Sequence, residues 1–172
     1  MVEALLAGIK TQTRRALAPG SDPVKRFGAP GDRLWVRETY AAFGHWTRRR
    51  NTARGREEWA FVDLTRARGL AWRYDPEAAD VDGARVAGAA PAWHRRPALF
   101  MPRAASRILL EILDVRSERL GAIGEDDARA EGVGAAADPV RAYRAVWEGI
   151  NGAGSWDADP LVWVVRFRRL AP

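Results

Sequence analysis

The chain has 172 residues, of which 47% are hydrophobic and 29% are charged, and this length and composition predict one globular domain over residues 1–172. It contains no cysteine, which excludes disulfides and thiolate metal sites. Its net charge of +6 favours a polyanionic partner, with nucleic acid as the first candidate, although the Arg-rich and Ala-rich composition of a GC-rich genome would give the same charge.

The start of the chain predicts a short helix, a loop and a strand. Residues 2–7 have the character of the last turns of a helix, and Gly8 is placed to end it. A Pro/Gly loop at 18–30 leads to an alternating segment at 34–40, which predicts a strand. Glu38 falls on the face of that strand whose other residues are apolar, so we expect its carboxylate to pair with a cation or to lie at the mouth of a pocket.

The middle of the chain gives weaker signals. Residues 41–56 are polar and Arg-rich, and we expect an exposed loop there. Two short strands are predicted at 58–62 and 70–74, followed by an irregular stretch at 75–91 that is rich in Ala, Gly and Asp. Residues 93–103 mix aromatics, prolines and arginines in a pattern too interrupted for a helix. No shift in composition marks a domain boundary.

The C-terminal part predicts the most regular structure. Residues 106–115 form the longest strand candidate, and residues 125–131 predict a short helix that Gly132 ends. Asp138 followed by proline marks the start of another helix, and residues 161–170 predict a closing strand. Many strands with a few short helices indicate an α+β fold or a small barrel. The helix after Asp138 carries an apolar stripe that we assign to the core, made of Val140, Tyr143, Val146, Trp147 and Ile150.

The sequence argues against a membrane span and against a metal cofactor. No apolar run approaches the roughly 20 residues that a membrane helix needs. No signal segment opens the chain, so we expect a cytoplasmic protein without a membrane partner. His45 and His94 lie far apart and show no ligand spacing, and we therefore expect neither a metal nor a cofactor.

The segment Gly8–Arg15 carries the strongest chemical signal. Of the 28 lysines and arginines only two are lysines, and Lys10 is one of them. Unlike arginine, lysine can lose its proton and act as a base. Thr13 lies three residues further on and offers a hydroxyl that a neutral lysine could activate. The alternative is that Lys10 is an ordinary exposed cation, because the Lys-x-x-Thr spacing alone is common.

Tryptophan is unusually frequent, with eight residues in the chain. Trp46, Trp93 and Trp156 fall in predicted loops beside arginine or glycine, where an indole ring can stack on an unpaired base. The alternative is that these rings cover the edges of the core.

The segment Gly8–Arg15 matches the G-x-K-x-x-[ET]-x-R signature of ASCH domains. The resemblance extends in the right order along nearly the whole chain, which is similar to the phage-associated bacterial branch of that family. The segments that carry it are GDRLWVRETY at 31–40, MPRAASRILLEI at 101–112, EDDARAEGV at 125–133 and SWDADPLVWVVRF at 155–167.

The resemblance implies a PUA-like fold, which is a small and mostly antiparallel β-barrel with short helices on its outside and a cleft beside the signature. Family members usually have a strand before the first helix, whereas this chain opens inside that helix, so either its start site is misassigned or this version lacks the strand. The resemblance also implies that RNA or a modified nucleoside is the partner. One type of member hydrolyses the acyl amide of acetylated cytidine, and its Thr, Lys and Glu fall on Thr13, Lys10 and Glu131.

Two functions stay open from the sequence. In the first, the chain is an acylcytidine amidohydrolase in which Thr13 attacks the amide, Lys10 moves the proton, and Glu131 orients Lys10 or holds the substrate amine. In the second, it binds RNA or single-stranded nucleic acid without chemistry, and a ribonuclease that uses the same cleft lies between the two. The residues expected to bind the nucleic acid or nucleoside are Arg14, Arg15, Arg37, Glu38, Trp93, Arg103, Ser155 and Trp156.

Overall fold

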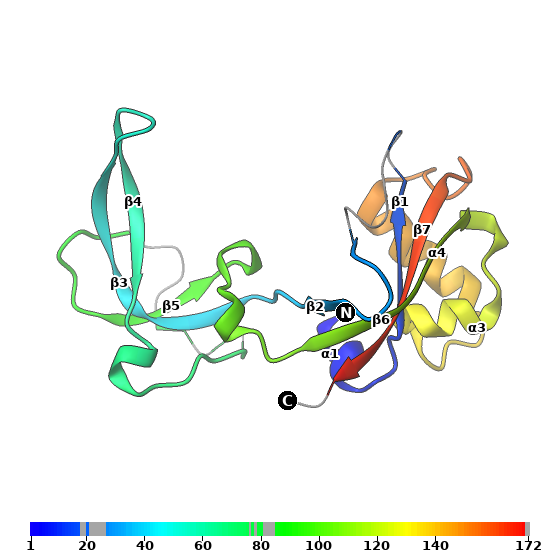
Figure 1. The fold of residues 1–172 in the computed structure, drawn as a ribbon, viewed down its shortest axis with the longest axis horizontal. Helices are drawn as coiled ribbons and strands as arrows, with labels where there is room; N and C mark the ends of the chain where they lie inside the picture. The colour runs from blue at the N-terminus through cyan, green and yellow to red at the C-terminus, as the bar shows by residue number, and fades with distance from the viewer. Residues whose placement is uncertain (18–19, 21–26, 76, 78, 81–84, 171–172) are drawn as a thin grey trace. The chain divides into compact units, whose positions relative to one another are not determined.

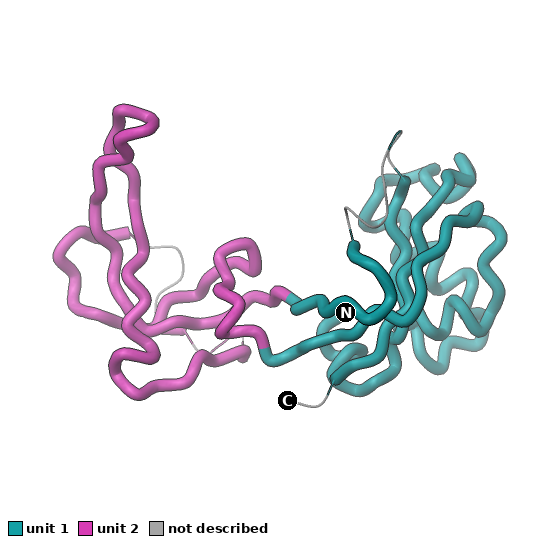
Figure 2. The backbone as a smooth tube through the Cα atoms, viewed as in Figure 1, with its two compact units in different colours: residues 1–36, 107–172 teal, residues 37–106 magenta. Residues whose placement is uncertain are grey.

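The computed structural model describes residues 1–17, 20, 27–75, 77, 79–80 and 85–170. Most of the predicted loop at 18–30, and part of the stretch at 75–91, lies outside these residues. The sequence predicted a single domain, and the chain divides into two compact units (Figure 2). Unit 1 joins Met1–Val36 to Arg107–Pro172, and unit 2 is Arg37–Ser106.

Unit 1 is built on a curled, four-stranded antiparallel sheet with the order β1-β7-β6-β2 (Figure 1). A β-bulge in β6 near Leu113 interrupts its register with β7, and such bulges increase the local bend of a sheet. The predicted strands at 106–115 and 161–170 are confirmed as β6 and β7. The strands are β1 (Gln12–Ala16), β2 (Arg33–Trp35), β6 (Leu109–Arg119) and β7 (Leu161–Leu170).

The predicted helices of unit 1 are present with the expected end signals. Gly8 adopts a φ of 72° after the first helix, as a residue that ends a helix commonly does. Asp138 caps the longest helix, where its Oδ1 accepts a hydrogen bond of 2.9 Å from the backbone N–H of Arg141. The segments are α1 (Val2–Leu6), η4 (Leu120–Ala122), α3 (Glu125–Ala128), the π-turn η5 (Arg129–Val133) and α4 (Pro139–Asn151).

The sheet of unit 1 is buried on both faces, because β7 directs apolar side chains to each side. Val162 and Val164 pack with α3 and α4 in one cluster that includes Tyr143 and Trp147. Val165 belongs to a second cluster, which contains α1 and the inward residues of β6. The near-continuous apolar run of β7 is therefore the expected pattern for a strand that is covered twice.

Unit 2 is organised around a three-stranded antiparallel sheet with the order β4-β3-β5. Short 3₁₀ turns connect and follow these strands. The strands are β3 (Tyr40–Asn51), β4 (Arg56–Asp63) and β5 (Ala92–Arg96), and the turns are η1 (Arg66–Arg68), η2 (Ala98–Phe100) and η3 (Arg103–Ala105).

Three predictions for this region need correction. The polar stretch 41–56 is a long strand and a hairpin turn rather than a loop, because its exposed arginines lie opposite Glu57 and Glu58 of β4. The strand predicted at 34–40 is divided between two sheets: Leu34 and Trp35 belong to β2, the chain leaves the sheet of unit 1 at Val36, and Tyr40 begins β3. The stretch 70–74 contributes a single bridge to β3 instead of a strand.

The described residues thus form an α+β structure with a curled antiparallel sheet, a second sheet and a few short helices. Of the helices in the part of the chain that is described, none has the length and apolar character needed to cross a membrane.

Candidate active site in unit 1

The site begins with Lys10, which backbone contacts hold in the turn between α1 and β1. The N–H groups of Ile9 and Lys10 both donate to the Ala4 carbonyl at 2.9 Å. The next N–H, from Thr11, donates to the carbonyl of Ala130 in η5 at 2.9 Å. These bonds join two segments that are far apart in sequence, and Lys10 is left only 5% exposed.

Glu131 receives the ammonium group of Lys10. Lys10 Nζ lies 2.7 Å from Glu131 Oε2 and 2.7 Å from the backbone carbonyl oxygen of the same residue. The side chains of both residues are almost fully excluded from solvent, with 4% and 3% exposure. Two of the three donors of the ammonium group are therefore committed to one residue of the π-turn.

Arg14 closes the other side of Glu131 and is itself fully buried. Its Nη1 lies 3.2 Å from Glu131 Oε1, and its Nη2 lies 2.6 Å from Glu118 Oε1 and 2.8 Å from Asp127 Oδ2. Three carboxylates thus surround a guanidinium with no exposed side-chain surface. A planar five-donor group suits this arrangement, so Arg14 belongs to the framework that fixes Glu131.

Burial shifts the protonation of both members of the central pair. It lowers the pKa of Lys10 below the ordinary value of 10.5, and this outweighs the opposing effect of Glu131. Arg15 and Arg14 act on the pKa of Lys10 in the same direction as burial. Burial also raises the pKa of Glu131, against the effect of Lys10 and Arg14. Both shifts favour a neutral Lys10, which is the form that can accept a proton.

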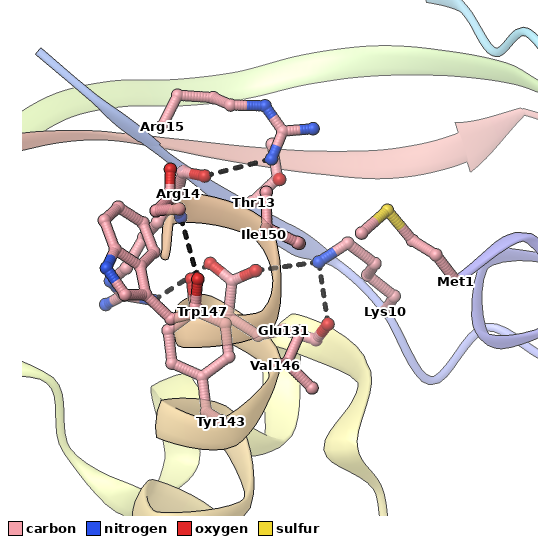
Figure 3. Close-up of a pocket in the computed structure, with 11 residues that line it drawn as sticks. Met1, Lys10, Thr13, Arg14, Arg15, Glu131, Tyr143, Val146, Trp147 and Ile150 are labelled. Atoms are coloured by element: carbon pink, nitrogen blue, oxygen red, sulfur yellow. Dashed lines mark hydrogen bonds and ion pairs between the residues drawn. The ribbon is translucent and has the colours of Figure 1, made fainter. Parts of the chain in front are cut away.

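A pocket of about 150 Å³ opens beside this pair (Figure 3). Lys10, Thr13 and Glu131 all contribute to its wall, so the structure brings the three predicted catalytic residues to one cavity. Helix α4 supplies the facing wall. The further lining residues are Met1, Arg14, Arg15, Tyr143, Val146, Trp147, Ile150 and Asn151.

The apolar stripe of α4 has two roles. The assignment to the core is confirmed for Tyr143 and Trp147, which are 4% and 3% exposed. It is wrong for Val146 and Ile150, which are 42% and 59% exposed and line the pocket. The stripe is wider than the sheet can cover, and its outer edge faces the cavity instead. The pocket therefore combines a charged wall with an apolar one.

Three further predicted binding residues lie in unit 1. Arg15 lines the pocket and donates from Nη1 to the Arg14 carbonyl at 3.2 Å. Trp156 packs edge-on against Tyr143, with 6.1 Å between ring centroids, but it is not among the residues that line the pocket. Ser155 precedes it and has a buried hydroxyl with no hydrogen-bond partner among the described residues.

The other predicted binding residues lie in unit 2. Arg37 is exposed and donates to a backbone carbonyl at 3.2 Å. Glu38 is buried, and Arg103 is exposed in η3. Trp93 is also buried, and the guanidinium of Arg73 covers its ring at 3.8 Å from the centroid. The ring face of Trp93 that carries Arg73 is thus already occupied.

No match to this chain is found among protein-family models, curated proteins or solved structures. Within the described ranges, no group of three or more His, Asp and Glu side chains could hold a metal ion.

Several residues of the site gave no signal in the sequence. Glu118 lies on a strand and Asp127 on a short helix, and nothing in their local patterns predicts that both contact one buried arginine. Tyr143 looked like an ordinary core residue. The width of the α4 stripe was the one sign in the sequence that Val146 and Ile150 lie at a surface rather than in the core.

Proposed function

We propose that unit 1 is an amide hydrolase with a PUA-like architecture of the ASCH type, and that its substrate is a nucleobase acylated on its exocyclic amine, such as acetylated cytidine. The observation that supports this most is the shared pocket of Lys10 and Thr13, in which burial disfavours the charged form of Lys10. A neutral amine beside a hydroxyl is the arrangement that general-base activation of a nucleophile requires.

In the proposed reaction, Thr13 Oγ attacks the amide carbonyl carbon while Lys10 Nζ takes the hydroxyl proton. The tetrahedral intermediate collapses when Lys10 returns that proton to the leaving amine, which departs as the deacylated nucleoside and leaves an acyl ester on Thr13. Water then attacks the ester with Lys10 again as the base, and this releases the carboxylate and restores Thr13. Arg15, at the wall of the pocket, is the cation available to the developing oxyanion.

Glu131 and Arg14 act as positioning residues in this scheme. Glu131 holds Lys10 through two hydrogen bonds, and Arg14 holds Glu131 from the far side. The apolar side chains of Val146 and Ile150 provide a surface for the flat base. A pocket of about 150 Å³ suits a single small ring rather than a helix of nucleic acid.

The test is release of acetate and cytidine from acetylated cytidine. We expect the Thr13→Ala and Lys10→Ala variants to lose at least about 100-fold in kcat/KM, as the removal of a nucleophile or general base does. Thr11→Ala is the matched control, because Thr11 is exposed and is not among the lining residues, and its activity should equal that of the wild type.

Equal rates in the Thr13, Lys10 and Thr11 variants would refute the assignment. If the wild type binds the nucleoside but does not hydrolyse it, the pocket of unit 1 is a binding site and not an active site. Cleavage of labelled RNA that depends on Lys10, without release of acetate, would indicate a ribonuclease in its place.

A further inference from the structure

Unit 2 contains a second cavity, of about 280 Å³, whose lining is cationic and aromatic. Among the described residues that line it there is no carboxylate. Three arginines contribute to its wall together with an indole and a phenyl ring. The lining residues are Thr39, Trp46, Arg85, Arg95, Arg96, Pro97 and Phe100.

Arg96 is the central residue of this cavity. It is only 7% exposed, and its guanidinium carbon lies 4.3 Å from the ring centroid of Phe61, 4.7 Å from that of Trp46 and 5.1 Å from that of Phe100. The Tyr40 hydroxyl acts on the Arg96 pKa from close by, and it donates to the backbone carbonyl of Phe100 at 3.0 Å. Arg96 Nε has no partner among the described residues, and burial lowers the Arg96 pKa.

Aromatic rings and a hydroxyl surround the buried guanidinium of Arg96, and they carry no negative charge to balance its positive charge. Buried arginines in protein interiors usually pair with a carboxylate, because desolvation of an unpaired charge is strongly unfavourable. Arg14 of unit 1 shows that arrangement, with three carboxylates around it. Within the described part of unit 2, no carboxylate forms an ion pair with Arg96, so an anionic group from outside would supply the missing compensation.

The cavity also continues into a second hollow, of about 590 Å³. The two share four lining residues, so they form one groove over β3 and β4. The second hollow adds Trp59, with the guanidinium of Arg48 5.1 Å from its ring, and the exposed Arg54 and Arg56. The shared residues are Trp46, Arg85, Arg96 and Phe100.

Glu57 and Glu58 are the acidic residues of the second hollow, and both are already paired. Glu58 Oε1 lies 3.0 Å from Arg56 and 3.3 Å from Arg54, and Glu57 lies 3.5 Å from Arg48. The whole of unit 2 contains 13 arginines against eight aspartates and glutamates, which places a net charge of +5 there out of the +6 of the chain.

We propose that this groove, named the β3–β4 groove, binds a single-stranded nucleic acid, with a phosphate at Arg96 and Arg85 and a base stacked on the exposed ring of Phe100. Arg85 and Arg96 both lie against the Trp46 ring, at 4.9 and 4.7 Å from its centroid, and a single strand likewise presents phosphates beside bases. A phosphorylated tyrosine side chain would fit the first cavity but would not use the second. This inference does not depend on the proposed hydrolase, because its residues all lie in unit 2.

The test is the fluorescence anisotropy of a short labelled single strand titrated with the full-length protein. Phe100→Ala removes a ring that is 56% exposed and should weaken binding by about fivefold or more, as the loss of one base stack does. Arg85→Ala should lower the slope of log affinity against log salt by about 0.7 for the phosphate contact that is lost.

Arg68→Ala is the matched control, since Arg68 is an exposed arginine of unit 2 that lines neither hollow. It removes the same charge and should leave affinity within about twofold of the wild type. Equal weakening by Arg68→Ala and Arg85→Ala would overturn the proposal, because binding would then follow net charge alone. An unchanged affinity of the Phe100 variant would overturn it as well.

Two competitors define the ligand. A free nucleoside monophosphate should displace the strand only at concentrations at least about tenfold higher, because it fills one part of the groove. Equal affinity of the mononucleotide and the strand would refute an extended groove. Binding of a tyrosine-phosphorylated peptide, without binding of the strand, would assign the groove to a different partner and overturn the proposal.

Discussion

At the scale of single residues, the buried pair of Lys10 and Glu131 sets the pH dependence of the proposed reaction. Burial lowers the pKa of Lys10 and the charge of Glu131 raises it, with burial dominant. Only the unprotonated amine can accept the proton of Thr13. The limb of the kcat/KM profile that reports Lys10 should therefore rise with pH and have its midpoint below 10.5.

The Glu131→Gln variant tests this balance. Loss of the carboxylate removes the influence that holds the proton on Lys10, so the rising limb should move to lower pH than in the wild type. The amide keeps an acceptor oxygen for Lys10, which makes it the mildest change at this position. Measurement of kcat/KM against pH in both proteins would show the shift. A limb displaced toward higher pH would contradict the role given to the charge of Glu131.

Gly132 is a second residue on which the pair depends. Its φ is 100°, and a Cβ built there would lie 3.1 Å from Lys10 Cβ and 3.2 Å from Ala4 Cβ. We expect Gly132→Ala to destabilise the fold by about 1–3 kcal/mol. Alanine is strained at this φ, and its methyl group would press against the side chains of Lys10 and Ala4. Urea denaturation would measure the change in the free energy of unfolding.

Gly149 provides the control for that substitution. It lies within α4, and a Cβ there would have no neighbour within 4 Å. Gly149→Ala should stabilise the protein by about 0.5–1 kcal/mol, because alanine is favoured in a helix. Opposite signs at the two glycines would separate strain from a general effect of adding a methyl group. Destabilisation by both variants would contradict the explanation.

At the scale of elements, α4 forms one wall of the site, and its start is fixed by a single side chain. Asp138 Oδ1 accepts from the backbone N–H of Arg141 at 2.9 Å. Asp138→Ala should cost about 1 kcal/mol in the free energy of unfolding, whereas Asp138→Asn should cost much less, since asparagine also caps helices. Thermal unfolding monitored by circular dichroism would compare the two. Equal losses would indicate that the charge matters more than the cap.

The elements that local signals mark could be predicted from the sequence. Helix α4 has a capping residue, a proline and an apolar stripe, and β7 has a nearly continuous apolar run, so both were found. Strand β3 was missed, because its polar residues are stabilised by partners on β4 that the local sequence does not reveal. The exposed edge of the α4 stripe was misassigned for a related reason, since coverage of a helix depends on its neighbours.

Some residues of the candidate site could likewise be predicted from the local sequence, and others could not. Lys10 and Thr13 lie in one short segment, and from their spacing one could expect both side chains to line the same pocket. Glu131 entered only through a family resemblance, because 121 positions separate it from Lys10. Glu118 of β6 and Asp127 of α3, the other two carboxylates around Arg14, could not be inferred without the fold.

At the scale of the whole molecule, unit 2 is an insertion into unit 1. Strands β2 and β6 pair side by side, with Leu34 opposite Leu110, and the Val36 N–H donates to the Ile108 carbonyl at 3.0 Å. The chain therefore leaves and re-enters the sheet of unit 1 at adjacent positions. Both of the apolar clusters described for unit 1 consist of residues outside the insertion.

This connection leads to a prediction about the two functions. Replacement of residues 37–106 by a short Asn-Gly turn should close β2 and β6 as a hairpin and leave unit 1 folded. The shortened protein should keep its activity toward acylated cytidine within a few-fold and lose its affinity for a labelled single strand. Retention of the full strand affinity would assign the binding to unit 1 instead. A shortened protein that unfolds would show that unit 1 depends on the inserted segment.

The chain leaves unit 1 at Val36 and returns at the adjacent Ile108, and this arrangement has an evolutionary consequence. An insertion at the tip of a hairpin changes neither the order of the strands nor the packing beneath them. Substitutions within residues 37–106 can accumulate, or the segment can be exchanged for another, while the lysine-containing pocket keeps its geometry. Under the two proposals, selection can then alter the binding of nucleic acid and the hydrolysis of the amide as two separate traits.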